Sequence, residues 1–437
     1  MTSVNRISKT IPVRNSSAFK HKALQWAQQF NEVVFLESNS ASQERKQPYS
    51  NYDAVLAIGA QNSISTGYKN AFKKLKIFQN DHKDFLFGHL NYDLKNDIED
   101  LSSSHEDHIG FPDLYFFQPK KLFLWKNNQV EMLYLSDFKA EIELDLQAIK
   151  DFSLPKLSGS SPLEIVSKIS KESYFNKVDN ILEHIHRGDI YEVNFCQEFY
   201  AKKALIDPIA VYHKLNEISQ APFASFMKLK DKFLLCSSPE RFARKEADKI
   251  VVQPIKGTAR RIDDIREDQL LAQNLSNDPK ERAENIMIVD LIRNDLSKCA
   301  KKGSVKVEEL CQVYSFKQVH QLISTVSCEV KKKTHVVDII KDLFPMGSMT
   351  GAPKISAMKI IEEEEETKRG LYSGAVGYFT PEGDFDFNVV IRSILYNASS
   401  EYASFSVGSA ITSLSEIEKE YEECLLKAKA LRQALGA

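Results

Sequence analysis

Residues 233–258, FLLCSSPERFARKEADKIVVQPIKGT, contain two short apolar strands with no helical pattern between them. The first predicted strand covers 233–238, and the second covers 250–253, where Pro254 ends it. In the rest of the chain, predicted strands and helices mix without the regular alternation of a doubly wound parallel sheet. This pattern favours an α+β fold.

Amphipathic patterns on both sides of this stretch predict helices. Residues 170–187 form one such segment, which Gly188 ends, and residues 264–299 form two, broken near Asp278 and Pro279. Further helices are predicted over 20–30, 336–344, 356–366 and 415–435. Further strands are predicted over 32–38, 190–199, 374–379 and 388–395.

The length of 437 residues predicts two or three domains. Pro, Gly and Ser cluster over 153–162, which indicates a boundary between an N-terminal subdomain, 1–155, and a second domain, 160–437. Lys and Arg number 58 against 60 Asp and Glu, so a strongly basic nucleic-acid binder is not the expected class.

Apolar runs and cysteines predict the compartment. The longest apolar run, 54–60, has seven residues, and the N-terminus lacks an apolar segment after its positive charges. The six cysteines form no C-x-x-C pair, which argues against a disulfide framework or a zinc site. We therefore expect a cytoplasmic protein with reduced, mostly buried thiols.

Two residues of the opening stretch are candidates for chemistry. Lys256 follows a strand end, where burial would favour its neutral, nucleophilic amine. A solvated lysine is the commoner outcome, since lysine is mostly exposed. Glu240 is either a charge at a helix start or an acid in a cleft, and the acid would need a raised pKa at neutral pH.

Carboxylates recur at helical spacing in two later segments. Glu281 and Glu284 lie one turn apart at the start of a predicted helix, and Glu420 and Glu423 repeat that spacing before Lys427. Either pair can simply complement a helix dipole or form a surface ion pair. If the two helices face each other, one carboxylate from each would suit Mg²⁺, beside a lysine for a substrate carboxylate.

A small-residue stretch and one arginine complete the candidates. The sequence GSMTGAPK, 347–354, opens a predicted helix and would let a ligand approach the backbone, although its spacing is not that of a P-loop. Arg392, on a predicted strand, suits bidentate contact with a carboxylate.

Together these blocks resemble the chorismate-utilising enzyme family. The resemblance covers about 170–435, with eight blocks in the family's order and spacing. They are GDIYEVNFCQEF (188–199), SSPERF (237–242), PIKGT (254–258), DPKERAEN with IVDLIRND (278–295), GSMTGAPK (347–354), RGLYSGAVGYF (369–379), NVVIRS (388–393) and the Glu/Lys pattern of 420–427. The resemblance implies two mainly antiparallel sheets packed as a sandwich, with helices on the outside.

One position separates the branches of this family. Anthranilate synthase large subunits carry Ala where this chain has Lys256, whereas the aminodeoxychorismate synthase branch carries Lys in a P-I-K-G-T motif. Isochorismate and salicylate synthases have a water-activating Lys at the position of Glu192. The chain is therefore most similar to the aminodeoxychorismate synthase branch, which leads to 4-aminobenzoate and folate.

The resemblance implies amination of chorismate with ammonia to 4-amino-4-deoxychorismate. Lys256 would form a covalent adduct at C2 while Glu240 protonates the departing C4 hydroxyl. Four carboxylates make up the implied Mg²⁺ site: Glu284 and Glu423 as ligands, with Glu281 and Glu420 behind them. The implied substrate contacts are Thr258, Ser348, Thr350, Tyr372, Arg392, Gly408 and Lys427.

The chain departs from the family pattern at three positions whose roles stay open. Gln321 replaces the usual histidine and follows His320, Ala410 replaces a glycine, and Glu192 replaces Gln or Lys. Near the N-terminus, FLES at 35–38 resembles a tryptophan-binding stretch, which implies Glu37 and Ser38 as tryptophan contacts. The same four residues are equally compatible with a strand that ends in a turn and binds no ligand.

The resemblance covers only the synthase subunit. No glutaminase nucleophile motif surrounds any cysteine, so ammonia is expected from a separate glutamine amidotransferase subunit. Two alternatives stay open: anthranilate synthase component I, and a non-catalytic subunit that binds tryptophan or chorismate. The presence of Lys256, Glu240, Glu284 and Glu423 argues against the second.

Overall fold

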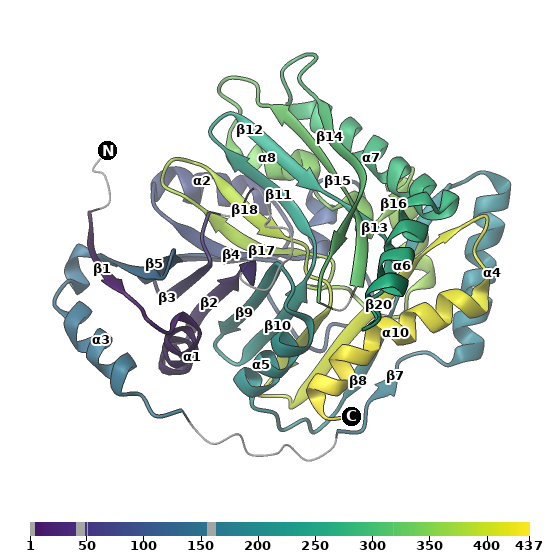
Figure 1. Ribbon diagram of the computed structural model, residues 1–437. Coiled ribbons are helices and arrows are strands. Elements are labelled where there is room, and N and C mark those ends of the chain that lie inside the picture. The colour runs from purple at the N-terminus through teal and green to yellow at the C-terminus, as the bar shows by residue number, and fades with distance from the viewer. Residues whose placement is uncertain (1–4, 41–48, 50, 155–162, 318) are drawn as a thin grey trace.

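The computed structural model describes residues 5–40, 49, 51–154, 163–317 and 319–437 (Figure 1). The helices are α1 (Ser16–Trp26), α2 (Ala71–Asp81), α3 (Glu141–Asp151), α4 (Lys171–Arg187), α5 (Pro208–Ser219), α6 (Ile265–Asn277), α7 (Pro279–Cys299), α8 (Val336–Leu343), α9 (Lys354–Glu364) and α10 (Ile417–Leu435). Short 3₁₀ helices include η3 (Tyr92–Asp97) and η5 (Gly347–Met349).

The strands lie in one hydrogen-bonded network. They are β1 (Arg6–Pro12), β2 (Glu32–Glu37), β3 (Ala54–Thr66), β4 (Leu86–Leu90), β5 (Leu114–Lys126), β6 (Gln129–Leu135), β7 (Val166–Ser167), β8 (Glu192–Ala201), β9 (Phe223–Leu229), β10 (Lys232–Ser238), β11 (Arg241–Glu246), β12 (Lys249–Gln253), β13 (Ile255–Arg260), β14 (Lys306–Ser315), β15 (Val319–Glu329), β16 (Gly351–Ala352), β17 (Ala375–Phe379), β18 (Phe385–Asn388), β19 (Ser393–Asn397) and β20 (Tyr402–Thr412).

Two arms of this network meet at the long strands β3 and β5. The first arm continues from β5 through β4, β17, β18, β11 and β12 to β15, where β13 and β14 both pair. The second continues from β3 through β2, β9, β10, β19 and β20 to β8. Every pairing in these arms is antiparallel, which confirms the α+β class and the mainly antiparallel strands. The two layers of the expected sandwich are joined through β3 and β5.

The cores explain how the arms stack. Successive residues of β10 point to opposite faces, so Leu234 and Leu235 join different clusters of buried side chains. The cluster of Leu234 also contains Phe387 from β18, so side chains of both arms pack together. The cluster of Leu235 contains side chains of α1, α4, α5 and α10, which cover the outer face of the second arm (Figure 1).

Several predicted boundaries are confirmed. Gly188 ends α4 in the left-handed conformation, at φ 87°, which a residue without Cβ adopts without strain. Asp278 separates α6 from α7, and its side chain accepts hydrogen bonds from the backbone N–H groups of Lys280 and Glu281. All six cysteines are free and buried.

One local prediction is wrong. The strand predicted over 388–395 is broken, because Val389 and Val390 donate their backbone N–H groups to Glu240 O and Gly374 O instead of to a neighbouring strand. Arg392 therefore lies between β18 and β19, with a φ of 50°. The stretch 347–354 leads into a helix as predicted, since α9 begins at Lys354, the last residue of the stretch, after η5 and β16.

The proposed division at about residue 155 stays a prediction, and 155–162 lie outside the described residues. Strands from both sides of it share the network, since β2 pairs with β9 and β4 with β17. Among the described helices, none combines the length and apolar character needed to cross a membrane.

Candidate active site

A cavity of about 900 Å³ opens where β8, β13, β20, α7 and α10 meet. Twelve of the predicted catalytic, metal and substrate residues line it, from segments far apart in the sequence. They are Glu240, Lys256, Thr258, Glu281, Glu284, Ser348, Tyr372, Arg392, Gly408, Glu420, Glu423 and Lys427.

Glu240 lies in the turn between β10 and β11, so its interpretation as a charge at a helix start is wrong. The side chain is only 5% exposed, and Ser348 Oγ donates to its Oε1 at 2.6 Å. Burial raises the pKa of Glu240 to about 7, against the opposing effects of Ser348 and Lys256. Glu240 thus has the protonation equilibrium of a general acid at neutral pH.

Lys256 is on β13 and donates from Nζ to Glu192 Oε1 at 2.6 Å. Burial by itself lowers the pKa of this amine, but the negative charges of Glu192 and Glu284 outweigh it, and the pKa is raised above its ordinary value. The expectation that burial favours the neutral amine is therefore wrong for the free protein. Lys256 is an ammonium group that must lose a proton before it can attack.

The carboxylates of α7 and α10 face each other across the cavity. Lys280 joins the two helices, with Nζ at 3.5 Å from Glu420 Oε1 and 4.0 Å from Glu284 Oε1. Burial, together with the charges of Glu192 and Glu281, raises the pKa of Glu284 to about 7 against the effect of Lys256. Burial and Glu423 also raise the pKa of Glu281.

The other carboxylates of this group have close partners. Burial acts to raise the pKa of Glu423, but the ion pair with Lys427 at 2.5 Å outweighs it, and the pKa is lowered. Ser415 Oγ donates to Glu420 Oε1 at 2.8 Å. Within the described part of the chain, no three or more His, Cys, Asp or Glu side chains form a ready metal cluster. A cation here would take one or two carboxylates and complete its shell with water and substrate.

Cationic and polar groups line the same cavity as these carboxylates. The Arg392 guanidinium forms no hydrogen bond or ion pair with the residues that the structure describes, whereas Arg392 O accepts the backbone N–H of Ser237 at 3.1 Å. Arg392 lines the cavity and has a left-handed backbone conformation. Lys427 Nζ donates to Gly408 O at 2.8 Å. The Tyr372 hydroxyl lies 3.6 Å from Cys196 Sγ. The cavity therefore combines an acidic side with cations that could receive carboxylates.

Three predicted residues do not line this cavity. Thr350 is buried, and its hydroxyl bonds to Met346 O and Gly347 O at 3.2 Å each. Glu37 and Ser38 line a separate cavity of about 70 Å³. Glu37 is already held by Lys20 at 2.6 Å and by Asn216 at 3.2 Å.

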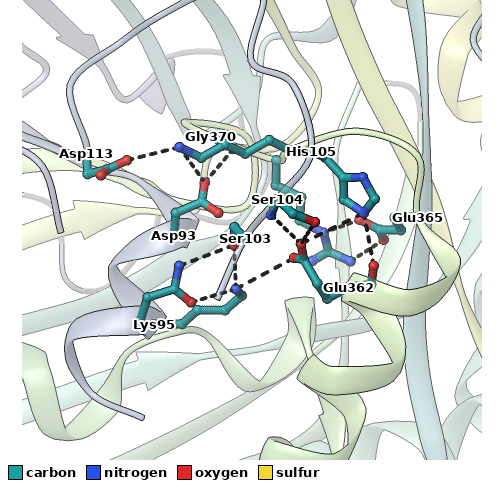
Figure 2. Close-up of polar contacts among 12 residues, drawn as sticks. Asp93, Lys95, Ser103, Ser104, His105, Asp113, Glu362, Glu365 and Gly370 are labelled. Atoms are coloured by element: carbon teal, nitrogen blue, oxygen red, sulfur yellow. Dashed lines mark hydrogen bonds and ion pairs between the residues drawn. The ribbon is translucent and has the colours of Figure 1, made fainter. Parts of the chain in front are cut away.

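A polar network behind the cavity holds the segment that leads to Tyr372. Figure 2 shows side chains of 93–113 meeting the end of α9 and the loop after it, and Asp93 accepts the backbone N–H of Gly370 at 3.0 Å. Arg369 pairs with Glu365 at 2.6 Å and donates to Asn194 O at 2.8 Å. This buried ion pair ties the loop to β8.

Two lining residues, Lys280 and Asn194, were not singled out from the sequence. Gln321, whose role the sequence left open, also lines the cavity. Asn194 lies in the block 188–199 and Lys280 in the block 278–295, so their place in these family blocks was the signal that could have identified them. His320 is buried, contacts Asp268 and Ser315, and does not line the cavity.

Comparison with known proteins places this site in a family. The model of the chorismate binding enzyme family matches residues 20–433. Aminodeoxychorismate synthase component 1 of Escherichia coli K12 is 35% identical over 356 residues, which are 80% of this chain and 76% of that protein. The chloroplastic aminodeoxychorismate synthase of Arabidopsis thaliana is 34% identical over 83% of this chain, but the chain spans only 42% of its length.

A solved structure agrees with this match. Anthranilate synthase component I from Streptococcus pneumoniae superposes with a TM-score of 0.77 and 25% identity, covering 89% of this chain and 93% of that one. The family match covers almost the whole chain and includes every residue that lines the large cavity. The chain belongs to the chorismate binding enzyme family.

Proposed function

We propose that this chain is component I of an aminodeoxychorismate synthase, which aminates chorismate to 4-amino-4-deoxychorismate with ammonia. The observation that carries the proposal is the meeting of a buried lysine and an acid with a pKa of about 7, Lys256 and Glu240, in one cavity. The relative from Escherichia coli carries this name at 35% identity. An amine nucleophile and a proton donor are the two groups that displacement of a ring hydroxyl requires.

The first half of the reaction uses both groups. Lys256, once deprotonated, adds to C2 of the ring while the proton of Glu240 goes to the departing C4 oxygen, which leaves as water. In the second half, ammonia adds at C4, the C2–N bond breaks, and the C4 ammonium returns a proton to Glu240. Covalent catalysis of this kind divides one hard displacement into two easier steps.

The acidic side of the cavity fits Mg²⁺. Glu281 and Glu284 both have raised pKa values, because burial and neighbouring carboxylates disfavour their charged forms. A divalent cation would relieve that repulsion, and Mg²⁺ prefers a few carboxylate oxygens with water. Glu284 and Glu423 would hold it, with Glu281 and Glu420 behind them. When bound, it would act as a Lewis acid toward a substrate carboxylate.

The remaining polar groups bind the substrate. Arg392 and Lys427 supply positive charge for the second carboxylate, and Tyr372 lines the same cavity. Ser348 orients Glu240 as well as bordering the cavity. The designation "component 1" of the relatives implies a second component. We propose that this component is a separate glutamine amidotransferase subunit that supplies the ammonia. The small cavity beside Glu37 and Ser38 is the proposed tryptophan pocket.

The test is the identity of the product. The purified chain is incubated with chorismate, Mg²⁺ and ammonium salt, and products are analysed by mass spectrometry with and without an added 4-amino-4-deoxychorismate lyase. We expect a product that the lyase converts to 4-aminobenzoate. Anthranilate with pyruvate would instead assign the chain to the anthranilate synthases, and chorismate binding without turnover would indicate a binding subunit.

A lysine substitution tests the nucleophile. The variant Lys256→Ala should lose amination by roughly 10³-fold or more, the scale of losing a covalent nucleophile. Lys232→Ala, at the start of β10 and outside the cavity lining, is the matched control and should keep its activity. Full activity of Lys256→Ala would refute the covalent route.

A further inference from the structure

We propose that Glu192 is the catalytic base that takes the proton from Lys256 before the lysine attacks, and that it returns this proton when the product is released. The inference rests on the proposed amination reaction and adds a step to it. It concerns the residue whose role the sequence left open, at the position where this chain departs from the Gln or Lys of related enzymes.

The contact is direct and shielded from water. Glu192 Oε1 lies 2.6 Å from Lys256 Nζ, and the two side chains are 1% and 10% exposed. Glu192 does not line the cavity, whereas Lys256 does. The carboxylate is therefore behind the amine, on the side away from the substrate. It contacts the reacting nitrogen without occupying substrate space.

The backbone holds this carboxylate in place from both sides. Glu192 is the first residue of β8, and it pairs with Ala352 of β16 on one side and with Thr412 of β20 on the other. Pairing on both edges fixes the backbone of Glu192, and its burial at 1% exposure leaves the side chain little room to move. In addition, Glu192 Oε2 is buried and has no hydrogen-bond partner among the described residues. This free oxygen is an acceptor that the fold leaves unused.

The other carboxylates near Lys256 already have roles in the proposed reaction. The groups whose charges act on Lys256 are Glu192, Glu284 and Glu240, and Lys256 in turn acts on Glu281 and Glu423. Glu240 must carry a proton to serve as the acid, and Ser348 already occupies its Oε1. The α7 and α10 carboxylates face the proposed cation. Glu192 is the carboxylate that both contacts the amine and has no other assignment.

The proton balance closes over one turnover. Glu192 starts as a carboxylate and Lys256 as an ammonium group, and transfer gives a carboxylic acid and a neutral amine. The amine nitrogen forms the bond to C2 with its lone pair, and it recovers that pair when ammonia displaces it. Glu192 then returns the proton, so both groups end as they began. The proton on the departing C4 oxygen comes from Glu240, and the C4 ammonium replaces it.

The test is the pH profile of Glu192→Gln. In the parent chain the proton moves internally, so kcat/KM between pH 6 and 8 should be flat below about 7 and fall above it, as Glu240 ionises. In Glu192→Gln the solvent must remove the proton, so kcat/KM should rise about tenfold per pH unit up to 7. At pH 6 we expect a loss of about 100-fold, within the usual contribution of a general base. The loss should shrink as the pH rises.

A matched control separates proton transfer from damage to the strand. Glu198→Gln makes the same substitution on β8, where Glu198 bonds to Tyr402 at 3.4 Å and has no contact with Lys256. It should keep the profile of the parent chain. A pH-independent loss in Glu192→Gln would mean a merely structural role, and a gain in rate would mean that Glu192 only holds Lys256 in its charged form. Either result would overturn the proposal.

A second readout does not depend on turnover. Trace acetylation of Lys256 with acetic anhydride, followed across pH by mass spectrometry, reports its pKa in the free protein. Glu192→Gln should lower that pKa, so labelling at pH 8 should increase about tenfold for each pH unit of change. If the parent chain makes no aminated product, the proposed function fails, and the labelling then decides whether Glu192 controls the protonation of Lys256 in the free protein. Unchanged labelling in Glu192→Gln would overturn it.

Discussion

Removal of the Ser348 hydroxyl should raise the pKa of Glu240, the proposed acid of the active site. Ser348 Oγ donates to Glu240 Oε1 at 2.6 Å, and this hydrogen bond lowers the pKa of a carboxyl group that burial otherwise raises, with a net value of about 7. Ser348→Ala removes the donor and leaves the burial. The variant should therefore hold the Glu240 proton more tightly.

The magnitude follows from the strength of the bond. A hydrogen bond to a charged group contributes about 1.5–3 kcal/mol and one to a neutral group about 0.5–1.5 kcal/mol. The difference of roughly 1–1.5 kcal/mol corresponds to about one pH unit, at ~1.36 kcal/mol per unit. The acid form is present below its pKa and is lost as the pH rises through it. Activity that needs protonated Glu240 should thus persist about one pH unit higher in Ser348→Ala.

The assay is the pH dependence of kcat/KM for 4-amino-4-deoxychorismate formation, coupled to a lyase. Total ammonium is adjusted at each pH so that free ammonia stays constant. Because Ser348 also borders the cavity, a lower overall rate is expected, and the position of the break in the profile is the readout. Ser238→Ala is the control, since Ser238 Oγ bonds only to the backbone N and O of Glu240, at 3.2 and 3.3 Å. A break in Ser348→Ala that stays near the parent value, or moves to lower pH, would refute this account of Glu240.

Three further predictions concern the metal site and the scaffold. Glu284→Gln and Glu423→Gln should each weaken Mg²⁺ binding by at least about tenfold in calorimetric titrations. Glu418→Gln is the control and should leave the affinity unchanged, because Glu418 is an exposed residue of α10 that pairs with Lys171. Equal Mg²⁺ affinities in all three variants would place the cation elsewhere. Gly408→Ala should destabilise the fold by about 1–3 kcal/mol in urea unfolding, because the added Cβ would lie 2.5 Å from Phe195 O and Cys196 Sγ. Gly67→Ala is the control and should be tolerated, because its Cβ would lie 3.6 Å from the nearest atom. Glu365→Ala should cost about 3–5 kcal/mol, seen as a large fall in Tm, because it leaves the buried charge of Arg369 without its partner; a Tm close to the parent value would show that the network of Figure 2 does not hold the loop.

Local features of the chain could be predicted because they depend on neighbouring residues alone. Gly188 ends α4 and Asp278 caps α7 through interactions within a few residues. The spacing of Glu281 and Glu284 likewise places both on one side of α7 wherever that helix packs. The motif blocks identified the family and most of the cavity lining for the same reason, since each block contributes its residues as a unit.

Predictions failed where distant segments compete for the same backbone groups. Arg392 lies in a break of the sheet because Val389 and Val390 bond to segments more than ten residues away. The joining of the two layers through β3 and β5 depends on pairings that no local pattern encodes.

Residue types and spacing therefore determined by themselves the α+β class, the family and the list of candidate side chains. Only the tertiary structure decided the protonation of those side chains. The pKa of Lys256 depends on Glu192 and Glu284, and that of Glu240 depends on its burial beneath Ser348. A charge buried in a protein responds to every other charge within a few ångströms. These neighbours come from segments far apart in the chain, 64 residues for Lys256 and Glu192 and 108 for Ser348 and Glu240.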